Sequence, residues 1–452
     1  MNKKMAEKIW LMINKVRKNI EISQLCKLLI YSFVLELIRI KKDEYEVKYL
    51  IEFDEKYTVN YLTLTYGKVI KPYDLGRYIA EFEREIGFED TIIANEFERL
   101  LINVDEEVIR AIWGEIAMIN FESLEQLYEV TLILLHKMSR AIGTMRAENF
   151  TSTSVCKLEA KLLDCKEGML VYDGFCGSGV SINEVAGNKG IVYMQDINTS
   201  ALALAKIVTL LKGNNIGEIR CSDSILNPVN DMLYDRIVCE PPFGLKYTND
   251  YLMSIPENNC IHQDILNSES VAIRHVLARL KDDGVAVIVV PMGMLFKSGR
   301  MATVREILAK NYIDAVIELP SGAWMNTGIV TALVILKKNK KDDSIYMLNA
   351  KGFFKKEDKI QFILSDEKAE EITKMYKNRE IVEGVSNNVN IMEIESKEYN
   401  LCTAQYVTLN LEDTIVIEDN MKFVKKYNQL ESQLADVEKQ IFEVRSRFTK
   451  EV

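Results

Sequence analysis

Apolar side chains recur at three- and four-residue spacing through residues 8–142, so one apolar stripe runs along each predicted helix. The spacing is clear in Ile9, Ile13, Val16 and Ile20. We therefore predict an α-helical N-terminal domain over residues 1–145. The interval 45–70 is ambiguous, because every second residue over 57–65 is aromatic or β-branched, as in a strand.

From residue 146 the pattern changes to short apolar, β-branched runs separated by helical stretches. Such alternation is typical of a parallel sheet built from βαβ units. We predict strands over residues 169–172, 191–194, 218–221, 236–239, 285–290, 315–319 and 331–336. The predicted fold class is therefore α/β, with the sheet domain over residues 146–350.

The chain after residue 350 is more polar and helical, which predicts a C-terminal extension over residues 351–420. A heptad pattern sustained for more than three repeats follows in residues 421–452, with charges between the apolar positions. Those apolar positions are Phe423, Tyr427, Leu430, Leu434, Val437, Ile441, Val444 and Phe448. This coiled-coil-like helix either packs on its own chain or pairs with a helix of another chain.

Length and composition point to an ordinary globular protein. With 452 residues the chain exceeds the usual size of one core, and 48% hydrophobic residues suffice for several domains. The longest apolar run, residues 28–38, is interrupted by Ser32 and Glu36 and is shorter than the roughly 18 residues of a membrane span. The start of the chain lacks a signal-peptide pattern. We expect a cytoplasmic protein with no membrane span.

Cysteine spacing and net charge limit the ligands. The eight cysteines form no C-x-x-C pair and only three histidines accompany them, so we expect reduced thiols and no metal site. The formal net charge is -10. A protein that binds DNA without a partner normally has a net positive charge, because neutralisation of the DNA phosphates supplies much of the affinity. DNA binding would therefore need a local basic face or a partner chain. The lysines of residues 337–341 either contact phosphate or form a solvated hairpin turn.

A glycine-rich turn follows the first predicted strand. It reads Asp173-Gly174-Phe175-Cys176-Gly177-Ser178-Gly179. Glycine leaves the backbone bare, so a ligand can approach the amides closely. The order G-x-x-G-x-G after an acid favours the methyltransferase turn over the dinucleotide order G-x-G-x-x-G. We expect this turn to bind S-adenosylmethionine, and a purely structural turn is the alternative.

Acidic residues also end the next two predicted strands. Asp196 stands at about the spacing at which an acid meets ribose hydroxyls. Asp223 could accept a hydrogen bond from the adenine amine of the cofactor. We expect the adjacent Ile197 and Ser224 to contact the cofactor as well. Helix capping by either aspartate is the alternative.

The fourth predicted strand ends in Glu240-Pro241-Pro242-Phe243. This stretch resembles the motif of the amino-methylating DNA methyltransferases, in which Asn or Asp precedes two prolines and an aromatic residue. In that family the side-chain oxygen and the carbonyl of the next proline accept hydrogen bonds from the exocyclic amine, and the aromatic ring stacks on the flipped base. The resemblance implies these catalytic roles for Glu240, Pro241 and Phe243. A plain strand-ending turn is the alternative.

Glu240 departs from the motif by one methylene. The longer side chain moves the carboxylate by about one carbon–carbon bond, and such a shift can cost on the order of a hundredfold in rate. Catalytic competence is therefore a separate question from cofactor binding.

Further segments are similar to the methylation subunit of type I restriction-modification systems, notably residues 289–296, 313–329 and 331–337. Residues 148–151 resemble that family's cofactor-side motif, which implies that Phe150 and Thr151 contact the cofactor, although Ser152 stands where proline is typical. The resemblance implies a Rossmann-like class I sheet that binds S-adenosylmethionine, and seven strands are the number this sheet needs.

The same resemblance implies a division of labour. This subunit binds cofactor and flips adenine in DNA, while a separate specificity subunit, docked on the helical termini, reads the sequence. A second copy and a nuclease subunit are further candidate partners. We predict a site-specific adenine-N6 DNA methyltransferase subunit. The alternatives are a catalytically impaired cofactor-binding partner and a methyltransferase acting on RNA or protein amines.

Overall fold

The computed structural model describes residues 2–17, 20–49, 53–142, 152–256, 267–323, 329–340, 342–357 and 362–407. Residues 1–407 form one compact unit. The predicted heptad helix lies outside the described residues, as do Phe150 and Thr151. Among the described residues, no helix combines the length and the apolar character that crossing a membrane requires.

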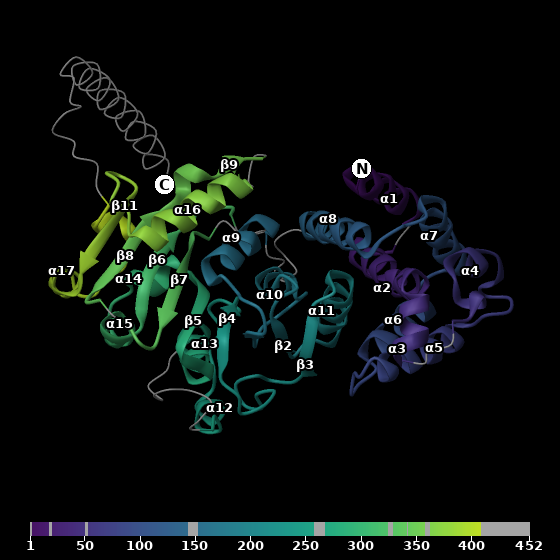
Figure 1. Cartoon of the computed structure of the whole chain (residues 1–452), viewed down its shortest axis with the longest axis horizontal. Helices are drawn as coiled ribbons and strands as arrows, with labels where there is room; N and C mark the ends of the chain where they lie inside the picture. Colours follow the sequence, from purple (N-terminus) through teal and green to yellow (C-terminus); the bar gives the residue numbers. More distant parts are fainter. Residues whose placement is uncertain are drawn as a thin grey trace, which may run out of the picture. The chain divides into compact units, whose positions relative to one another are not determined.

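The N-terminal part is helical, as the spacing of apolar residues predicts (Figure 1). Its helices are α1 (Asn2–Val16), α2 (Ile22–Ile40), α3 (Lys42–Tyr49), α4 (Val59–Thr65), α5 (Pro72–Glu85), α6 (Ile92–Asn103), α7 (Glu106–Ile119) and α8 (Leu124–Ile142). Within the ambiguous interval, the part with strand-like alternation forms α4 and not a strand. The Thr58 hydroxyl caps α4 by accepting from the Tyr61 amide, and Val59 and Leu62 turn inward.

A nine-stranded sheet follows, and it contains all seven strands predicted from the sequence. Its strands are β1 (Leu170–Asp173), β2 (Ile191–Asp196), β3 (Asn215–Cys221), β4 (Tyr234–Cys239), β5 (Leu280–Pro291), β6 (Ile313–Glu318), β7 (Thr331–Lys337), β8 (Ser344–Asn349) and β11 (Ser386–Asn390). The order across the sheet is β11-β8-β6-β7-β5-β4-β1-β2-β3. β7 runs antiparallel between β5 and β6, and the neighbours from β5 to β3 are parallel.

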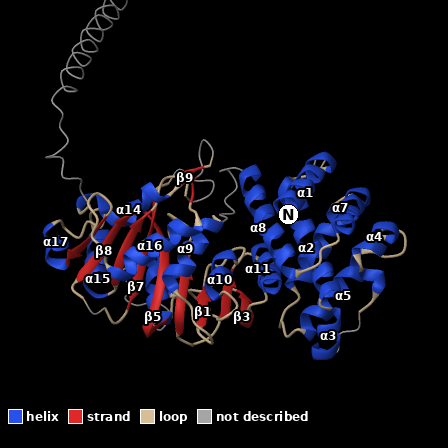
Figure 2. Ribbon diagram, turned by 45° about the horizontal axis from the view of Figure 1, so that its top comes forward, coloured by secondary structure: helices blue, strands red, loops and turns tan. Residues whose placement is uncertain are grey.

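Helices cover both faces of the sheet, which explains the nearly continuous apolar runs of its central strands (Figure 2). On β5, Val287 and Val289 belong to one core, and Ile288 and Val290 belong to the other. The first face packs against α9 (Thr153–Leu163), α10 (Val180–Ala186), α11 (Thr199–Lys212) and α16 (Asp366–Asn378). The second face packs against α13 (Ser268–Arg279) and α15 (Arg300–Asn311).

The sheet extends beyond its predicted end. β8 pairs parallel with β6, and β11 adds an antiparallel edge strand from the segment 351–407. The sequence of β11, Ser-Asn-Asn-Val-Asn, carries no apolar alternation, so periodicity does not reveal it. The domain boundaries after residues 145, 350 and 420 stay predictions.

Helix α11 is shared between the sheet and the N-terminal helices, because it packs on α2, α6 and α8 as well as on β2 and β3. Its Lys206 is fully buried, forms an ion pair with Asp90 and lies 3.8 Å from the Glu83 carboxylate. The Tyr31 hydroxyl of α2 donates to the Ser200 carbonyl at 3.2 Å. These contacts attach the helical part to one specific helix of the sheet layer.

The described lysines of the cluster 337–341, which exclude Lys341, make contacts within the protein. Lys337 lies 2.9 Å from Asp314, Lys338 lies 3.9 Å from Asp282, and Lys340 donates to the Ala309 carbonyl at 3.2 Å. These contacts favour the hairpin interpretation of the cluster over phosphate binding.

Candidate active site

A cavity of about 450 Å³ opens at the carboxyl ends of the parallel strands. The strand order reverses between β1 and β4, and ligands of open α/β sheets bind in the crevice at such a switch point. The cavity is lined by Gly174, Phe175, Gly177, Ser178, Asp196, Ile197, Asn198, Ala201, Leu204, Ser222, Asp223, Ser224, Ile225, Glu240, Pro242, Leu245, Tyr247 and Tyr251. The loops after β1, β2, β3 and β4 all contribute to this list.

The glycine-rich turn forms one wall of the cavity. Gly177 and Gly179 have φ values of +51° and +75°, which favour glycine over residues with a side chain. The Gly177 amide donates to the Asp196 carboxylate at 2.8 Å, so the turn is tied to the end of β2. A Cβ at Gly174 would lie 2.7 Å from the Tyr172 hydroxyl and 3.1 Å from the Ser224 hydroxyl. The turn therefore needs glycine for its shape and for its close approach to neighbouring loops.

Gly179 offers a test of that requirement. A Cβ there would lie 2.9 Å from the Cβ of Ala205 on α11, whereas a Cβ at Gly213, with a similar φ of +78°, meets nothing within 4 Å. We expect Gly179→Ala to lower the free energy of unfolding by about 2–4 kcal/mol, because overpacking adds to backbone strain. Gly213→Ala introduces only the backbone strain, without a close contact, and should lower the free energy of unfolding by about 1–2 kcal/mol. Urea unfolding measures both, and equal losses would contradict the close approach.

Asp173 lies beneath the turn and does not line the cavity. Its side chain is 2% exposed, and one carboxyl oxygen accepts from the Phe175 amide at 2.9 Å. Burial raises the pKa of Asp173 well above its usual range, and the nearby Glu240 and Asp196 carboxylates raise it further. A ligand that brings positive charge next to this residue would favour its ionised form.

Asp196 and Asp223 both face the cavity and are held by backbone amides. Asp196 accepts from Gly177 and also from the Asn198 amide at 2.8 Å. Asp223 accepts from the Ile225 amide at 2.9 Å and from the Tyr251 hydroxyl at 3.0 Å. The contact with the Ile225 amide resembles helix capping, which was the alternative role for Asp223. The same side chain also lines the cavity.

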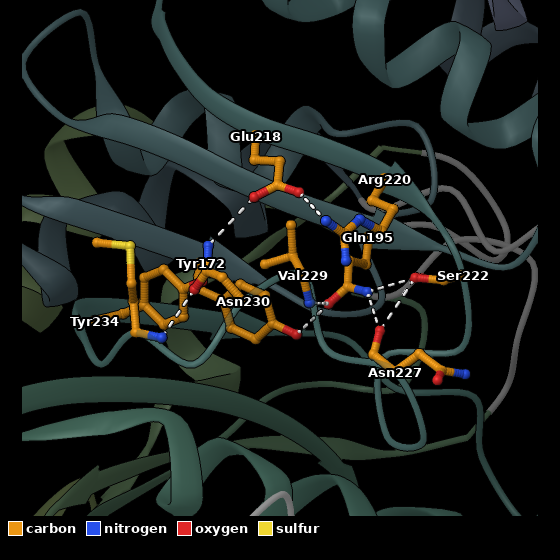
Figure 3. A network of polar contacts seen from close by, with 10 residues as sticks. Tyr172, Gln195, Glu218, Arg220, Ser222, Asn227, Val229, Asn230 and Tyr234 are labelled. Atoms are coloured by element: carbon orange, nitrogen blue, oxygen red, sulfur yellow. Dashed lines mark hydrogen bonds and ion pairs between the residues drawn. The ribbon is translucent and has the colours of Figure 1, made fainter. Parts of the chain in front are cut away.

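A buried side chain that sequence reasoning missed holds the loop after β3. Gln195 is 0% exposed, and its amide oxygen accepts from the Tyr172 hydroxyl at 3.0 Å and from the Val229 amide at 2.7 Å. Its amide nitrogen donates to the Ser222 hydroxyl at 2.7 Å and to the Asn227 carbonyl at 2.8 Å (Figure 3). Gln195 therefore satisfies four partners and fixes the loop that carries Asp223.

The predicted catalytic stretch reaches the cavity in part. Glu240 and Pro242 line the cavity, but Pro241 and Phe243 do not. Phe243 is half-buried and packs against the hydrophobic core. The Ser181 hydroxyl of α10 donates a hydrogen bond to the Glu240 carboxylate. The extra methylene of Glu240 thus extends toward α10, a contact that the motif alone does not predict.

The structure brings together most of the predicted site residues. Of these, the cavity wall contains Gly174, Phe175, Gly177, Ser178, Asp196, Ile197, Asp223, Ser224, Glu240 and Pro242. Asp173, Cys176, Gly179, Pro241 and Phe243 lie in the same loops without lining the cavity. The structure does not describe Phe150 and Thr151, so their roles stay predictions.

Other wall residues were not predicted. Ala201 and Leu204 project from α11, and Tyr247 and Tyr251 stack with ring centroids 4.4 Å apart. The tyrosines are four residues apart, a spacing that could have indicated one face of a helical turn after the double proline. For Ala201 and Leu204 the signal is weaker, because small apolar residues on a helix more often pack in the core.

Comparison with known proteins places the chain in a family. Residues 121–414 match the N-6 DNA methylase family. The MjaVIII type I restriction enzyme methylase subunit of Methanocaldococcus jannaschii is 27% identical over 357 residues, covering 72% of this chain and 59% of that protein. The MpnII type I methylase subunit of Mycoplasma pneumoniae is 24% identical over 387 residues, covering 78% and 70%. The chain therefore spans about three fifths of the MjaVIII subunit.

Solved structures confirm the fold class. The type I restriction-modification methyltransferase subunit of Streptococcus thermophilus has a TM-score of 0.72 at 22% identity, over 90% of this chain and 100% of that chain. A modification subunit of a type I restriction enzyme from Vibrio vulnificus has a TM-score of 0.65 at 18% identity, over 86% and 93%. These matches and the curated relatives confirm the resemblance to type I methylation subunits. Since the family match spans well over half of its length, this chain belongs to the N-6 DNA methylase family.

Proposed function

We propose that this chain is the methylation subunit of a type I-like restriction-modification system and transfers a methyl group from S-adenosylmethionine to adenine N6 in DNA. One observation carries the proposal: a single cavity combines the glycine turn and two strand-end carboxylates with Glu240 and Pro242 of the double-proline motif. The first group suits a nucleoside cofactor, and the second suits an exocyclic amine.

The residues of the cavity fit S-adenosylmethionine. The Asp196 carboxylate can accept from ribose hydroxyls, and Asp223 and Ser224 can contact the adenine ring. The bare backbone at Gly174 and Gly177 leaves room for the ligand beside the turn. The cofactor carries an ammonium and a sulfonium charge, which would favour the ionised form of the buried Asp173. When bound, S-adenosylmethionine supplies an electrophilic methyl group.

Cofactor binding is expected to tighten as pH rises through the pKa of Asp173 in the free protein, by up to about tenfold per pH unit, since one proton is released on binding. Burial and acidic neighbours raise the pKa of Asp173 in the free protein, whereas a cationic ligand favours the carboxylate, so binding is expected to release a proton. Calorimetric titration in buffers of different ionisation enthalpy measures this release. Asp173→Asn, which mimics the protonated acid, should bind more weakly and lose the pH dependence. Unchanged proton release in that variant would contradict the assignment.

The chemistry needs no covalent enzyme intermediate. Glu240 and the Pro241 carbonyl accept the hydrogens of the adenine amine, and the Phe243 ring stacks on the flipped base. These contacts would orient the N6 lone pair toward the electrophilic methyl group that bound S-adenosylmethionine would supply, and the proton that N6 gives up would pass to solvent. Burial raises the pKa of the Cys176 and Cys239 thiols, which keeps them protonated and poorly nucleophilic.

DNA and partner chains follow from the same proposal. The net charge of -10 disfavours unaided DNA binding, so a specificity subunit would read the sequence and supply much of the attraction. We assign its docking to the helical termini, including residues 421–452, and a second copy and a nuclease subunit complete the proposed assembly. With DNA as its substrate, the proposed location of the protein is the cytoplasm.

The decisive experiment uses tritiated S-adenosylmethionine and the chain co-expressed with a candidate specificity subunit from a neighbouring open reading frame. Label should appear in unmethylated DNA, at N6 of adenine, and not in RNA or protein fractions. Label in protein or RNA alone would defeat the proposal and favour an amine methyltransferase of another class.

A slowed or non-catalytic cofactor-binding partner is the second candidate. The contact between Ser181 and Glu240 favours it, because that hydrogen bond draws the carboxylate toward α10. Tight binding of S-adenosylmethionine without label in any acceptor would support this candidate.

A further inference from the structure

A buried acidic group lies directly behind the cavity wall. Glu159 and Cys156 of α9 and Glu240 at the end of β4 place one oxygen or sulfur atom each within 4.8 Å of one another. The Ser181 hydroxyl, which donates to Glu240, also lies 3.2 Å from the Cys156 sulfur. Glu240 faces the cavity on one side and this buried group on the other.

Glu159 is the unusual member of the group. Its side chain is 0% exposed, and neither carboxyl oxygen has a well-formed hydrogen bond among the described residues. The lysines of the same helix turn outward, since Lys157 and Lys161 pair with Asp366 and Glu370 of α16. They therefore do not neutralise Glu159.

Among the described residues, the titratable groups that interact with Glu159 or with its neighbour Cys156 are acidic or thiol-bearing. They are Cys156 on α9, Asp173 at the end of β1, Cys239 at the end of β4, Glu240 directly after β4, and Glu184 on α10, whose charge acts on Cys156. An isolated buried carboxylate beside a second carboxylate is costly, and such pairs usually keep a proton on one member. Burial and the Glu240 charge raise the pKa of Glu159 well above its usual range.

We propose that Glu159 is a carboxylic acid that keeps its proton at neutral pH and acts as a positioning residue for Glu240. Its hydroxyl and the Ser181 hydroxyl together hold the inner side of the Glu240 carboxylate, and Glu240 also lines the cavity in which the adenine amine would bind. Glu159 itself touches neither cofactor nor base. This arrangement gives the longer Glu240 a fixed place that the shorter Asn or Asp of the family motif would not need. The inference rests on the proposed function only for its catalytic consequence.

Protonation is tested without any methylation assay. The stabilising effect of a protonated Glu159 is complete below the ordinary glutamate pKa and is lost as pH rises through the raised value. Glu159→Gln keeps a neutral donor at all pH values. Its unfolding temperature should therefore match that of the wild type near pH 5 and exceed it by at least about 3 °C near pH 8.5. Glu167→Gln, at an exposed position, is the matched control. Its unfolding temperature should not rise above that of the wild type as pH increases from 5 to 8.5.

The positioning role is tested by the pH profile of DNA methylation in the complex. The wild-type rate should fall at alkaline pH, while Glu159→Gln should lack that fall and exceed the wild type there. Glu159→Leu, which removes the donor, should be slower than the wild type by roughly tenfold to a hundredfold below the pH at which the wild-type rate falls. Identical pH profiles for wild type and Glu159→Gln would overturn the positioning role.

Two results of the unfolding experiment would contradict the proposal that Glu159 keeps its proton at neutral pH. One is a Glu159→Gln variant that is less stable than the wild type by the same margin at both pH values. The other is stabilisation of the wild type by Zn²⁺ or Mn²⁺ that chelation reverses and Glu159→Gln abolishes, which would make the group a metal site. Because unfolding is read without activity, a failure of the proposed DNA methylation leaves this test intact.

Discussion

Glu240→Ala is expected to slow methyl transfer to DNA by roughly 10²–10³-fold, the usual cost of removing one positioned hydrogen-bonding group from a reacting centre. Affinity for S-adenosylmethionine should stay the same or increase, because the Glu240 charge helps to keep the buried Asp173 protonated. Single-turnover assays with tritiated cofactor, DNA and the specificity subunit measure the rate, and calorimetry measures binding. A fall in affinity with an unchanged rate would contradict the catalytic assignment.

Glu240→Asn restores the residue type of the family motif and separates the two candidate functions. Its shorter side chain does not reach Ser181 as Glu240 does, so we expect a rate below that of the wild type. A large gain instead would show that the native glutamate impairs the site. Together with the alanine variant, the result decides whether the longer side chain of Glu240 contributes to catalysis or impairs it.

Gln195→Leu is expected to lower the free energy of unfolding by about 2–5 kcal/mol, because a similar volume remains but buried partners lose their hydrogen bonds. The Val229 amide would lose its partner inside the protein, whereas the Tyr172 hydroxyl would lose Gln195 and keep its contact with the His275 ring at 3.0 Å. Affinity for S-adenosylmethionine should fall as well, by about tenfold, because the loop that carries Asp223 loses two anchors.

The control for this prediction is Gln405→Leu, since Gln405 is exposed and the substitution changes the same groups. Its free energy of unfolding should stay within about 0.5 kcal/mol of the wild type. Equal effects at both positions, measured by urea unfolding, would show that the network around Gln195 contributes nothing specific.

Helix α11 connects the site to the N-terminal helices. Ala201 and Leu204 line the cavity, while Lys206 on the same helix is buried against Glu83 and Asp90. Packing in the N-terminal part therefore supports one wall of the cofactor cavity. That link explains why the helices before the sheet matter for a site formed by strand ends.

Sequence periodicity predicted the regular elements well where burial dictates composition. The strand β5 is buried on both faces, so its run Val-Ala-Val-Ile-Val-Val is visible without a structure. The edge strand β11 is polar and was missed, because it is held by backbone pairing to β8 and not by an apolar face. The interval 57–65 looked like a strand, but capping by Thr58 and inward-facing Val59 and Leu62 make it helical.

The chemistry of the site was also predictable in outline, since acids and glycines at the ends of successive parallel strands must meet at one edge of the sheet. Asp196, Asp223 and Glu240 do share one cavity wall. Asp173 was expected beside them but lies buried beneath the turn. Its depth depends on packing from several elements, which a linear motif does not encode.

The sequence by itself determined the α/β class, the order of strands and helices along the chain, and the residue types at the strand ends, because periodicity and turn chemistry are local properties. Only the tertiary structure decided that Gln195 anchors the loop after β3, that α11 and two tyrosines complete the cavity, and that Glu159 and Ser181 stand behind Glu240. These relations join residues from separate elements, and burial, hydrogen bonding and charge act between them only after the chain has folded.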